Sequence, residues 1–275
     1  MGLKRKEYGF TLVELLTVLA IITMLIGLMV PAMTAVRNVA RETKQRAQLS
    51  TIELALTTFR NDFGDYPRSD WDPASSIDYC GAQKLAEALL GWDLMGFHPQ
   101  SIWDAIGTAY NPPDENNLRE RRGPYLELTT ANAFRLEDLF NNTSLLKQDT
   151  FVLCDSFGVK RIPIGEKTVR AGTPILYYRA NTSSRNIDGP FLNERIYDAR
   201  NNMPLVDLRT VTPDGTPGKE HPLLMDSYPF PFFYKEYIRD PKVTARLWPY
   251  RPNSYILITA GADGLYGTKD DICNF

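Results

Sequence analysis

The feature of this sequence that most restricts its fold is an apolar run from Phe10 to Val30. The run is 21 residues long, and Glu14 carries its only charge. A helix rises about 1.5 Å per residue, so the run spans about 30 Å, the thickness of the hydrocarbon core of a bilayer. Basic residues at positions 4–6 precede it, which favours a cytoplasmic N-terminus and places the body of the chain across the membrane.

Two ordinary interpretations of this run leave Glu14 unexplained. A secretory signal peptide has a basic start, and a cut after Ala32 or Ala35 would suit it, but its apolar segment is typically about 7–15 residues long. A plain single-pass anchor has the right length. In both cases a carboxylate inside the membrane helix costs free energy and requires a partner.

A third interpretation supplies that partner. The stretch G-F-T-L-V-E-L-L at residues 9–16 resembles the processing site of type IV pilins and of the pseudopilins of type II secretion systems. The resemblance implies that a prepilin peptidase cleaves after Gly9 and methylates Phe10. It also implies that Glu14 pairs with the α-amino group of Phe10 in a neighbouring subunit, which would neutralise two charges in lipid. Pro31 falls where many members of this family have a proline that bends the helix.

The helix is expected to continue beyond the apolar run, from about Phe10 to about Asn61. The sequence has no glycine between Pro31 and Gly64. An apolar stripe recurs at three- and four-residue steps, as on a helix that packs against a globular head; its members are Leu49, Ile52, Leu56, Phe59 and Phe63. Gly64 and the D-Y-P at residues 65–67 end the helix. The pattern F-x-x-x-F-G-D-Y-P resembles the helix exit of major pseudopilins.

The rest of the chain predicts a small mixed head. Residues 68–150 resemble an insertion, with a short amphipathic helix at Leu85–Leu90 and a second helical piece in N-A-F-R-L-E-D-L-F. Three β-rich runs at 151–154, 173–181 and 253–261 predict an antiparallel sheet against the second half of the long helix. D-S-F-G and Y-Y-R-A-N resemble a pseudopilin segment that a spacer at 159–174 interrupts.

The expected fold class is therefore α+β and pilin-like: a long N-terminal helix on a small antiparallel sheet, with helical and loop insertions. The expected segments are a cleaved leader, a membrane or filament-core half of the helix, a head-packing half, and a head with its insertion and its C-terminal strand and acidic loop. Their ranges are 1–9, 10–30, 31–63 and 64–275, with the insertion at 68–150 and the C-terminal part at 253–275.

The C-terminal loop G-A-D-G-L-Y-G-T-K-D-D contains three carboxylates, Asp263, Asp270 and Asp271. On spacing alone, a glycine-rich turn with solvated aspartates is the simpler interpretation, since the EF-hand spacing is absent. The resemblance implies more, because major pseudopilins bind calcium in a similar segment. It matches Asp263 to the first acidic ligand and Asp270 or Asp271 to the second, so Ca²⁺ is an expected cofactor.

Composition and the absence of certain motifs argue against several other classes of protein. The formal net charge is -2 and nothing suggests the basic stripe that a nucleic-acid partner would need, so no such partner is expected. Cys80, Cys154 and Cys273 form no CxxC pair, which argues against a zinc or thioredoxin-type site; an oxidising compartment would allow one disulfide of undetermined pairing. The two histidines lie in unrelated contexts and no catalytic motif occurs, so the chain is not expected to be an enzyme.

The expected function is that of a structural subunit of a type II secretion pseudopilus or a related filament. The resemblance implies a single-pass protein of the bacterial inner membrane with its head in the periplasm. Its implied partners are other copies of itself, the prepilin peptidase and the inner-membrane assembly machinery. Two alternatives stay open: a minor or tip pilin with ligand-binding inserts, and a membrane-anchored binding domain that uses a pilin-like helix.

Overall fold

The computed structural model describes residues 11–75, 79–226 and 229–275. The chain divides into two compact units, Met1–Thr43 and Lys44–Phe275. The α-helices are α1 Leu12–Phe63, α2 Gly81–Leu90, α3 Glu115–Glu120, α4 Leu128–Ala131, α5 Leu136–Leu139 and α6 Met203–Val206. The strands are β1 Ala133–Arg135, β2 Phe151–Leu153, β3 Lys160–Ile164, β4 Lys167–Ala171, β5 Leu176–Arg179, β6 Tyr255–Thr259 and β7 Ile272–Cys273. Short 3₁₀ turns and one π-helical turn, η5 Phe233–Tyr237, connect them.

Helix α1 confirms the predicted long helix, at Leu12–Phe63 instead of about Phe10 to about Asn61. It ends where Gly64 adopts a φ of +82° and donates its amide hydrogen to the Arg60 carbonyl at 2.7 Å, a typical glycine helix stop. Pro31 lies inside α1 without interrupting it, although proline has no amide hydrogen to donate to Gly27. The bend expected at Pro31 stays a prediction.

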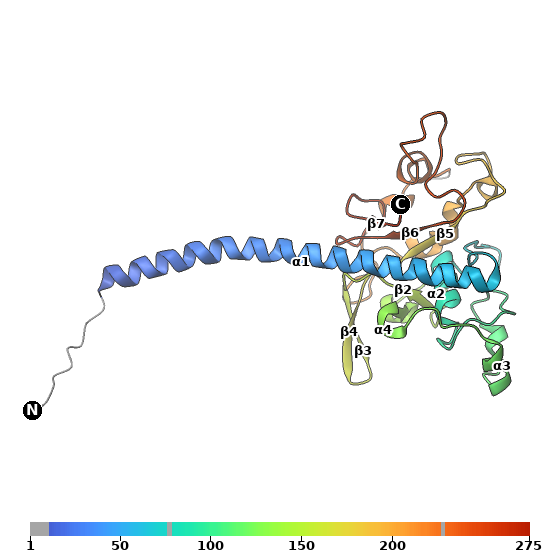
Figure 1. Cartoon of the computed structure of the whole chain (residues 1–275), viewed down its shortest axis with the longest axis horizontal. Coiled ribbons are helices and arrows are strands. Elements are labelled where there is room, and N and C mark those ends of the chain that lie inside the picture. The colour runs from blue at the N-terminus through green and yellow to red at the C-terminus, as the bar shows by residue number, and fades with distance from the viewer. Residues whose placement is uncertain (1–10, 76–78, 227–228) are drawn as a thin grey trace, which may run out of the picture. The chain divides into compact units, whose positions relative to one another are not determined.

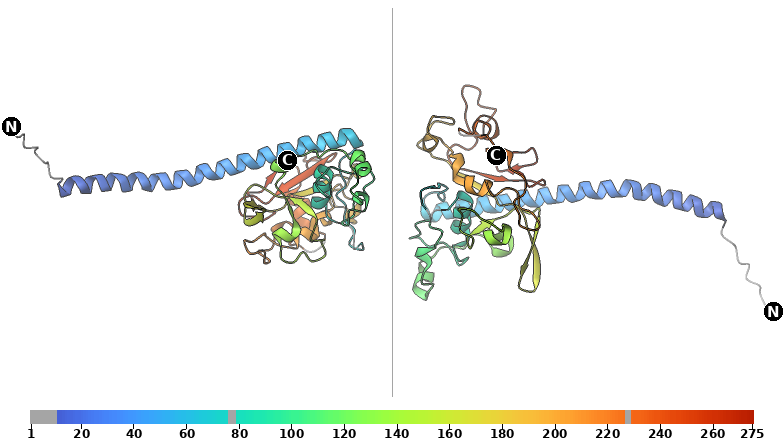
Figure 2. Two further views of the ribbon diagram at one scale, coloured as in Figure 1. Left: turned by 90° about the horizontal axis from the view of Figure 1, so that it is seen from below. Right: turned by 180° about the vertical axis from the view of Figure 1, so that it is seen from behind.

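The part of α1 in the second unit packs on the head through the predicted stripe. Leu49, Ile52, Leu56 and Phe59 are each at most 3% exposed. The first three join a core that includes residues of β5, β6 and β7, so the main sheet packs on this part of the helix, as Figures 1 and 2 show. Periodic apolar side chains therefore do fix one face of the helix to the head.

The main sheet has the antiparallel order β5-β6-β7, with Leu176 opposite Ile258 and Thr259 opposite Ile272. Two of the three predicted strands are in it. The prediction that the run at 151–154 joins them is confirmed only in part, because its strand β2 pairs with β1 and meets the run at 173–181 only in an isolated antiparallel bridge, Cys154 to Pro174. Two backbone hydrogen bonds form this connection, from the Ile175 amide to the Leu153 carbonyl, 2.7 Å, and from the Asp155 amide to the Thr173 carbonyl, 2.8 Å.

Two segments differ from their predicted form. N-A-F-R-L-E-D-L-F was predicted as helical, but its first half is β1, with Phe134 opposite Val152, and only Leu136–Leu139 is helix α5. The expected spacer at 159–174 contains the β3–β4 hairpin, which turns at Gly165 with a φ of +59°. The first segment differs because residues 133–135 pair with β2, and this tertiary pairing overrides a weak helical preference. The second differs because the sequence interpretation overlooked the two-residue turn between β3 and β4.

Helix α2 confirms the predicted short helix, but it is buried on every side and not only on one face. Its polar residues Gln83, Lys84 and Glu87 are at most 3% exposed. The aromatics that follow fill a satellite core, with Phe97 and Trp103 packed around Phe59. The insertion is therefore a second layer of the head.

The aromatic turn η5 at Phe233–Tyr237 also contributes to the core. Phe233 and Tyr234 are at most 1% exposed and belong to the largest core cluster.

Cys80, Cys154 and Cys273 are free thiols. The main cluster contains Cys80 and Cys154 as buried members, so these two thiols serve as small core side chains.

Candidate functional site

The N-terminal segment is the first candidate site. Gly9 and Phe10, the predicted processing residues, lie outside the described residues. The described part contains one helical stretch long and apolar enough to cross a membrane, Leu12–Val30, with a mean hydropathy of 2.5 and no buried side chains. Its exposed apolar surface requires lipid or other helices around it.

Glu14 has a local role that the sequence interpretation missed. Its carboxylate Oε2 accepts a hydrogen bond from the Thr11 amide at 2.8 Å and another from the Thr11 hydroxyl at 2.6 Å. The Thr11 Oγ1 in turn accepts from the Glu14 amide at 3.2 Å. This reciprocal arrangement is a capping box at the start of α1, and its Thr-x-x-Glu pattern was readable from the sequence. The carboxylate is thus satisfied within a single chain before any pairing between subunits.

The acidic loop between β6 and β7 is the second candidate. Asp263 and Asp270 lie together at its two ends: the Asp263 amide donates to Asp270 Oδ2 at 3.0 Å, and Asp263 Oδ1 accepts from the Leu265 amide at 2.8 Å. The Thr268 hydroxyl also donates to Asp270 Oδ1, at 2.6 Å. The loop closes tightly because Gly261, with a φ of +62°, sits against the Asp270 carbonyl, where a Cβ would clash.

The two carboxyl groups have pKa values shifted in opposite directions, although both side chains are exposed. Burial and the Asp270 charge raise the pKa of Asp263. Burial acts in the same direction on Asp270, but hydrogen bonds from the Thr268 hydroxyl and the Asp263 amide outweigh it and lower the pKa of Asp270. Two adjacent carboxyl groups rarely ionise together unless a cation lies between them. The pair therefore fits two oxygen ligands of a hard cation.

Asp271, the third predicted ligand, has a different environment. Its Oδ2 accepts from the Tyr237 hydroxyl and, at 2.7 Å, from the Gly267 amide. Burial raises the pKa of Asp271 to about 6. Residues 11–75, 79–226 and 229–275 contain no group of three or more His, Cys, Asp or Glu side chains arranged for a metal. Any further ligands at the Asp263–Asp270 pair would thus be carbonyl, hydroxyl or water oxygens.

The two histidines have structural surroundings. His221 is buried next to this loop, its Nδ1 accepts from the Tyr266 amide at 3.1 Å, and burial lowers its pKa to about 4. His98 is also buried, and its Nδ1 accepts from the Gln100 amide at 3.2 Å. Each imidazole thus holds a nearby loop as a hydrogen-bond acceptor.

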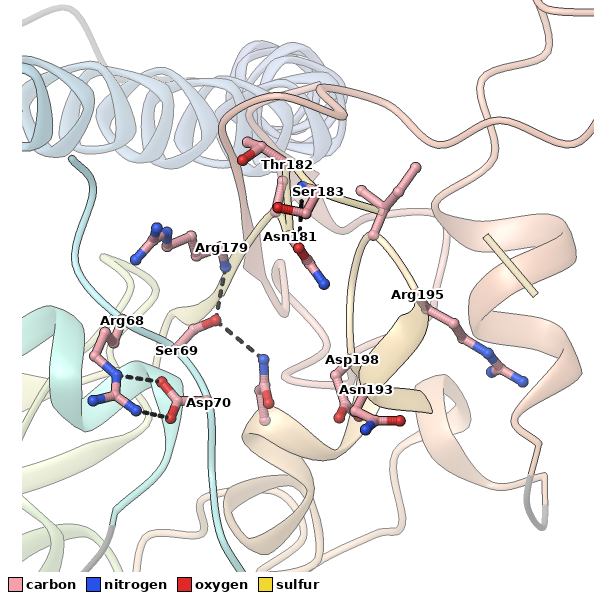
Figure 3. A pocket seen from close by; sticks show the side chains of 13 residues that line it. Arg68, Ser69, Asp70, Arg179, Asn181, Thr182, Ser183, Asn193, Arg195 and Asp198 are labelled. Atoms are coloured by element: carbon pink, nitrogen blue, oxygen red, sulfur yellow. Dashed lines mark hydrogen bonds and ion pairs between the residues drawn. The ribbon is translucent and has the colours of Figure 1, made fainter. Parts of the chain in front are cut away.

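A polar pocket of about 360 Å³ is the third candidate (Figure 3). Two of its arginines form ion pairs, Arg68 with Asp70 at 2.5 Å and Arg179 with Asp65 outside the lining, while Arg195 donates to the Gly189 and Pro229 carbonyls. Ser69 Oγ links two walls by accepting from the Arg179 amide at 2.8 Å and from Asn201 Nδ2 at 3.1 Å. These interactions stabilise the loops around the pocket and give it the character of a polar surface hollow.

Two glutamines of α1 attach the head to the helix by a contact that the sequence did not indicate. Gln45 Oε1 accepts from the Ser156 amide at 2.7 Å, and Gln48 Nε2 donates to the Cys154 carbonyl at 2.8 Å. The two side chains are three residues apart and so share one side of the helix. We call these four residues the glutamine clasp.

Comparison with known proteins adds one finding for the N-terminal segment. The family model described as the prokaryotic N-terminal methylation motif matches residues 4–30. Neither the curated proteins nor the solved structures gave a significant match. The match covers the apolar run, the capping box and the segment expected to be processed.

Proposed function

Since this chain begins with the N-terminal methylation motif that marks type IV pilin-like precursors, we propose that it is a structural subunit of a type II secretion pseudopilus or a related pilus-like filament. Prepilin peptidase is the processing enzyme that the motif implies. In this proposal the cut falls after Gly9, Phe10 is methylated, and the apolar part of α1 leaves the inner membrane for the core of the filament. The head then stays on the periplasmic side.

The observation that carries the proposal is a carboxylate at the start of a wholly exposed apolar helix. Leu12–Val30 has no buried side chains, so its surface must be covered by lipid or by neighbouring helices. Within that surface Glu14 is the only charged side chain. A second chain's α-amino group offers it a counter-charge, and two paired charges cost less in an apolar medium than two separate ones.

Filament assembly of two matched variants tests this role. Glu14→Gln retains an oxygen that can accept from the Thr11 amide but removes the negative charge, so we expect it to stay in the membrane without forming filaments. Thr11→Ala removes the capping hydroxyl but keeps the charge, so we expect filaments to form. Electron microscopy and sedimentation of sheared filaments measure both. Normal filaments from Glu14→Gln would show that charge pairing is not required.

The processing step has its own measurement. Intact mass and N-terminal sequencing of the protein from native membranes should show a chain that starts at N-methylated Phe10. A start after Ala32 or Ala35 would instead indicate a signal peptide, and an uncut Met1 would indicate a plain anchor. Either result would remove the filament proposal, because Phe10 would not carry the free α-amino group that pairs with Glu14.

We also propose that the Asp263–Asp270 pair holds Ca²⁺, which would neutralise the two carboxylates and join the two ends of the loop. A ligand at a hundred times its Kd stabilises the folded state by about 2.7 kcal/mol. For a domain of this size that corresponds to roughly 5–10 °C in Tm. We expect calcium to raise the Tm of the full chain and a chelator to lower it. Asp263→Asn should abolish the difference, while Asp188→Asn, in an exposed loop, should preserve it. An identical Tm with calcium and with chelator would contradict the site.

A further inference from the structure

Two arginines follow the apolar run of α1 without a nearby counter-charge. Arg37 is the first charged residue after Glu14, and Arg41 lies one helical turn beyond it. Both are exposed, and neither forms an ion pair with a residue that the structure describes. The next carboxylate along the chain is Glu42, which directly follows Arg41, and sequence neighbours do not face each other on a helix. The helix therefore presents two adjacent cations with no anion between them.

The depth of Arg37 in a membrane follows from the end of the apolar span. The span, Leu12–Val30, ends seven residues before Arg37, which is about 10 Å along the helix axis. Arg37 Nη2 donates to Met33 Sδ at 3.4 Å, so the side chain points back toward the span, the direction in which helical side chains start. Met33 is three residues past Val30, which places the guanidinium group about 5 Å beyond the hydrocarbon core. The headgroup layer extends roughly 5–8 Å beyond that core, so the guanidinium group lies among the headgroups.

The contact with Met33 leaves the Arg37 guanidinium group available to a stronger acceptor. A thioether sulfur is a weak acceptor, whereas a phosphate group takes two N–H donors of one guanidinium group at once. Arg41 lies on the same face, with its Cβ about 5–6 Å from that of Arg37, so a phosphate between them meets two positive charges. Lipid phosphates are present at this depth as soon as the helix is inserted, while a carboxylate of a second copy would be there only in a filament.

We infer that Arg37 and Arg41 bind the phosphate group of an anionic phospholipid in the leaflet where the span ends. The acyl chains of this lipid lie against the exposed apolar side chains of Leu12–Val30, and its headgroup lies beside the two guanidinium groups. The contact holds the helix at one depth in the membrane. The inference rests on the membrane insertion that the proposed function includes, but on neither cleavage nor assembly.

Native mass spectrometry of the full-length protein in an uncharged detergent tests this contact. Titration with dioleoylphosphatidylglycerol and with dioleoylphosphatidylcholine gives the Kd of the first bound lipid of each kind. We expect phosphatidylglycerol to bind at least about fivefold more tightly, the effect of one basic residue at an anionic membrane surface. The choline ammonium group of the other lipid competes with the arginines for its own phosphate. Glycerol 3-phosphate, a headgroup without acyl chains, should not bind at the same concentrations.

Three single variants assign the binding to the two arginines. Arg37→Gln and Arg41→Gln should each weaken phosphatidylglycerol binding about fivefold and leave phosphatidylcholine binding nearly unchanged. Lys44→Gln is the matched control, because Lys44 is exposed and follows Arg37 by two turns on the same face, about 10 Å farther from the span. It should bind both lipids like the parent. All three side chains are exposed, so each variant should keep the Tm of the parent.

Several results would overturn the inference. Equal Kd values for the two lipids, an unchanged preference in Arg37→Gln, or tight binding of glycerol 3-phosphate would each do so. Loss of filaments from Arg37→Gln with its lipid preference intact would assign Arg37 to a carboxylate of a second copy instead.

Flotation with phosphatidylcholine vesicles separates this inference from the proposed function. A protein that does not float with the vesicles is not inserted, which would overturn both proposals. A protein that floats but shows no lipid preference overturns the lipid contact alone. One that floats and prefers phosphatidylglycerol but forms no filaments removes the filament proposal and keeps this one.

Discussion

Among single residues, Glu87 shows most clearly how burial in the head changes the protonation of a side chain. Its Oε1 accepts from the Ser101 hydroxyl at 2.5 Å and from the Tyr110 hydroxyl at 2.8 Å. Its Oε2 is buried, and no donor in the described chain reaches it. Burial raises the pKa of Glu87 to about 8, and the nearby Asp104 charge acts in the same direction. At neutral pH this side chain is therefore a neutral acid inside the protein.

This pKa predicts how stability depends on pH. The folded state binds the Glu87 proton more tightly than the unfolded state, where the pKa is about 4.5. The contribution of Glu87 is thus fully present below pH 4.5 and is lost as pH rises to about 8, by about 1.4 kcal/mol per pH unit. The difference in free energy of unfolding between the parent and Glu87→Gln should follow this slope. Glu137→Gln, at the surface, should show none. A flat difference for Glu87→Gln would contradict a buried neutral carboxyl.

Some residues of the candidate sites could be predicted from the sequence, and others could not. Glu14 and the Asp263–Asp270 pair stand in local patterns, so both were predictable as candidates. Gln45, Gln48 and Ser156 were not, since polar residues on a helix normally indicate a solvated face. Their partners are backbone groups about a hundred positions away, which only the folded chain brings near.

At the scale of elements, the predictable features are those set by periodicity over many residues. The stripe on α1 repeats over four turns and predicted both the helix and its buried face. Strand β7 has two residues, too few for any alternation to be visible, and its place beside β6 follows from the closure of the acidic loop. Strand β1 was misjudged because tertiary pairing overrides a weak helical preference.

The packed face of α1 gives a direct test at this scale. Ile52 is fully buried, whereas Leu54 on the same helix is 68% exposed. Ile52→Ala should lower the free energy of unfolding of the head by about 2–5 kcal/mol, because it leaves a cavity. Leu54→Ala should change it by no more than about 0.5 kcal/mol. Urea titration of monomers in detergent, followed by tryptophan fluorescence, measures both; equal losses would show that this stripe does not anchor the helix.

At the scale of the whole molecule, stability of the second unit rests on packing and polar contacts instead of covalent bridges. Three cysteines are present and all are free. Cys80 and Cys154 are fully buried, and burial raises the pKa of the Cys154 thiol. Both should therefore resist alkylation in the folded protein.

Alkylation with intact-mass readout checks this statement. In denaturant without reductant, iodoacetamide should add to all three thiols of each chain, and in native buffer Cys80 and Cys154 should stay unmodified. Reductant should leave the Tm unchanged. A single adduct in denaturant would reveal a disulfide and would contradict the free-thiol arrangement.

The capping box at Thr11 and Glu14 has a consequence for the cut chain that concerns the helix dipole. The proposed cleavage after Gly9 would leave one residue ahead of Thr11 and so would create a new ammonium group within a few bonds of the positive end of α1. About half an elementary charge resides at that end, which disfavours a nearby cation by up to about 1 kcal/mol. The Glu14 carboxylate in the first turn offsets both charges at once. In the proposed filament, the same side chain would let a helix start directly after the cleavage site and still accommodate a free amino terminus in apolar surroundings.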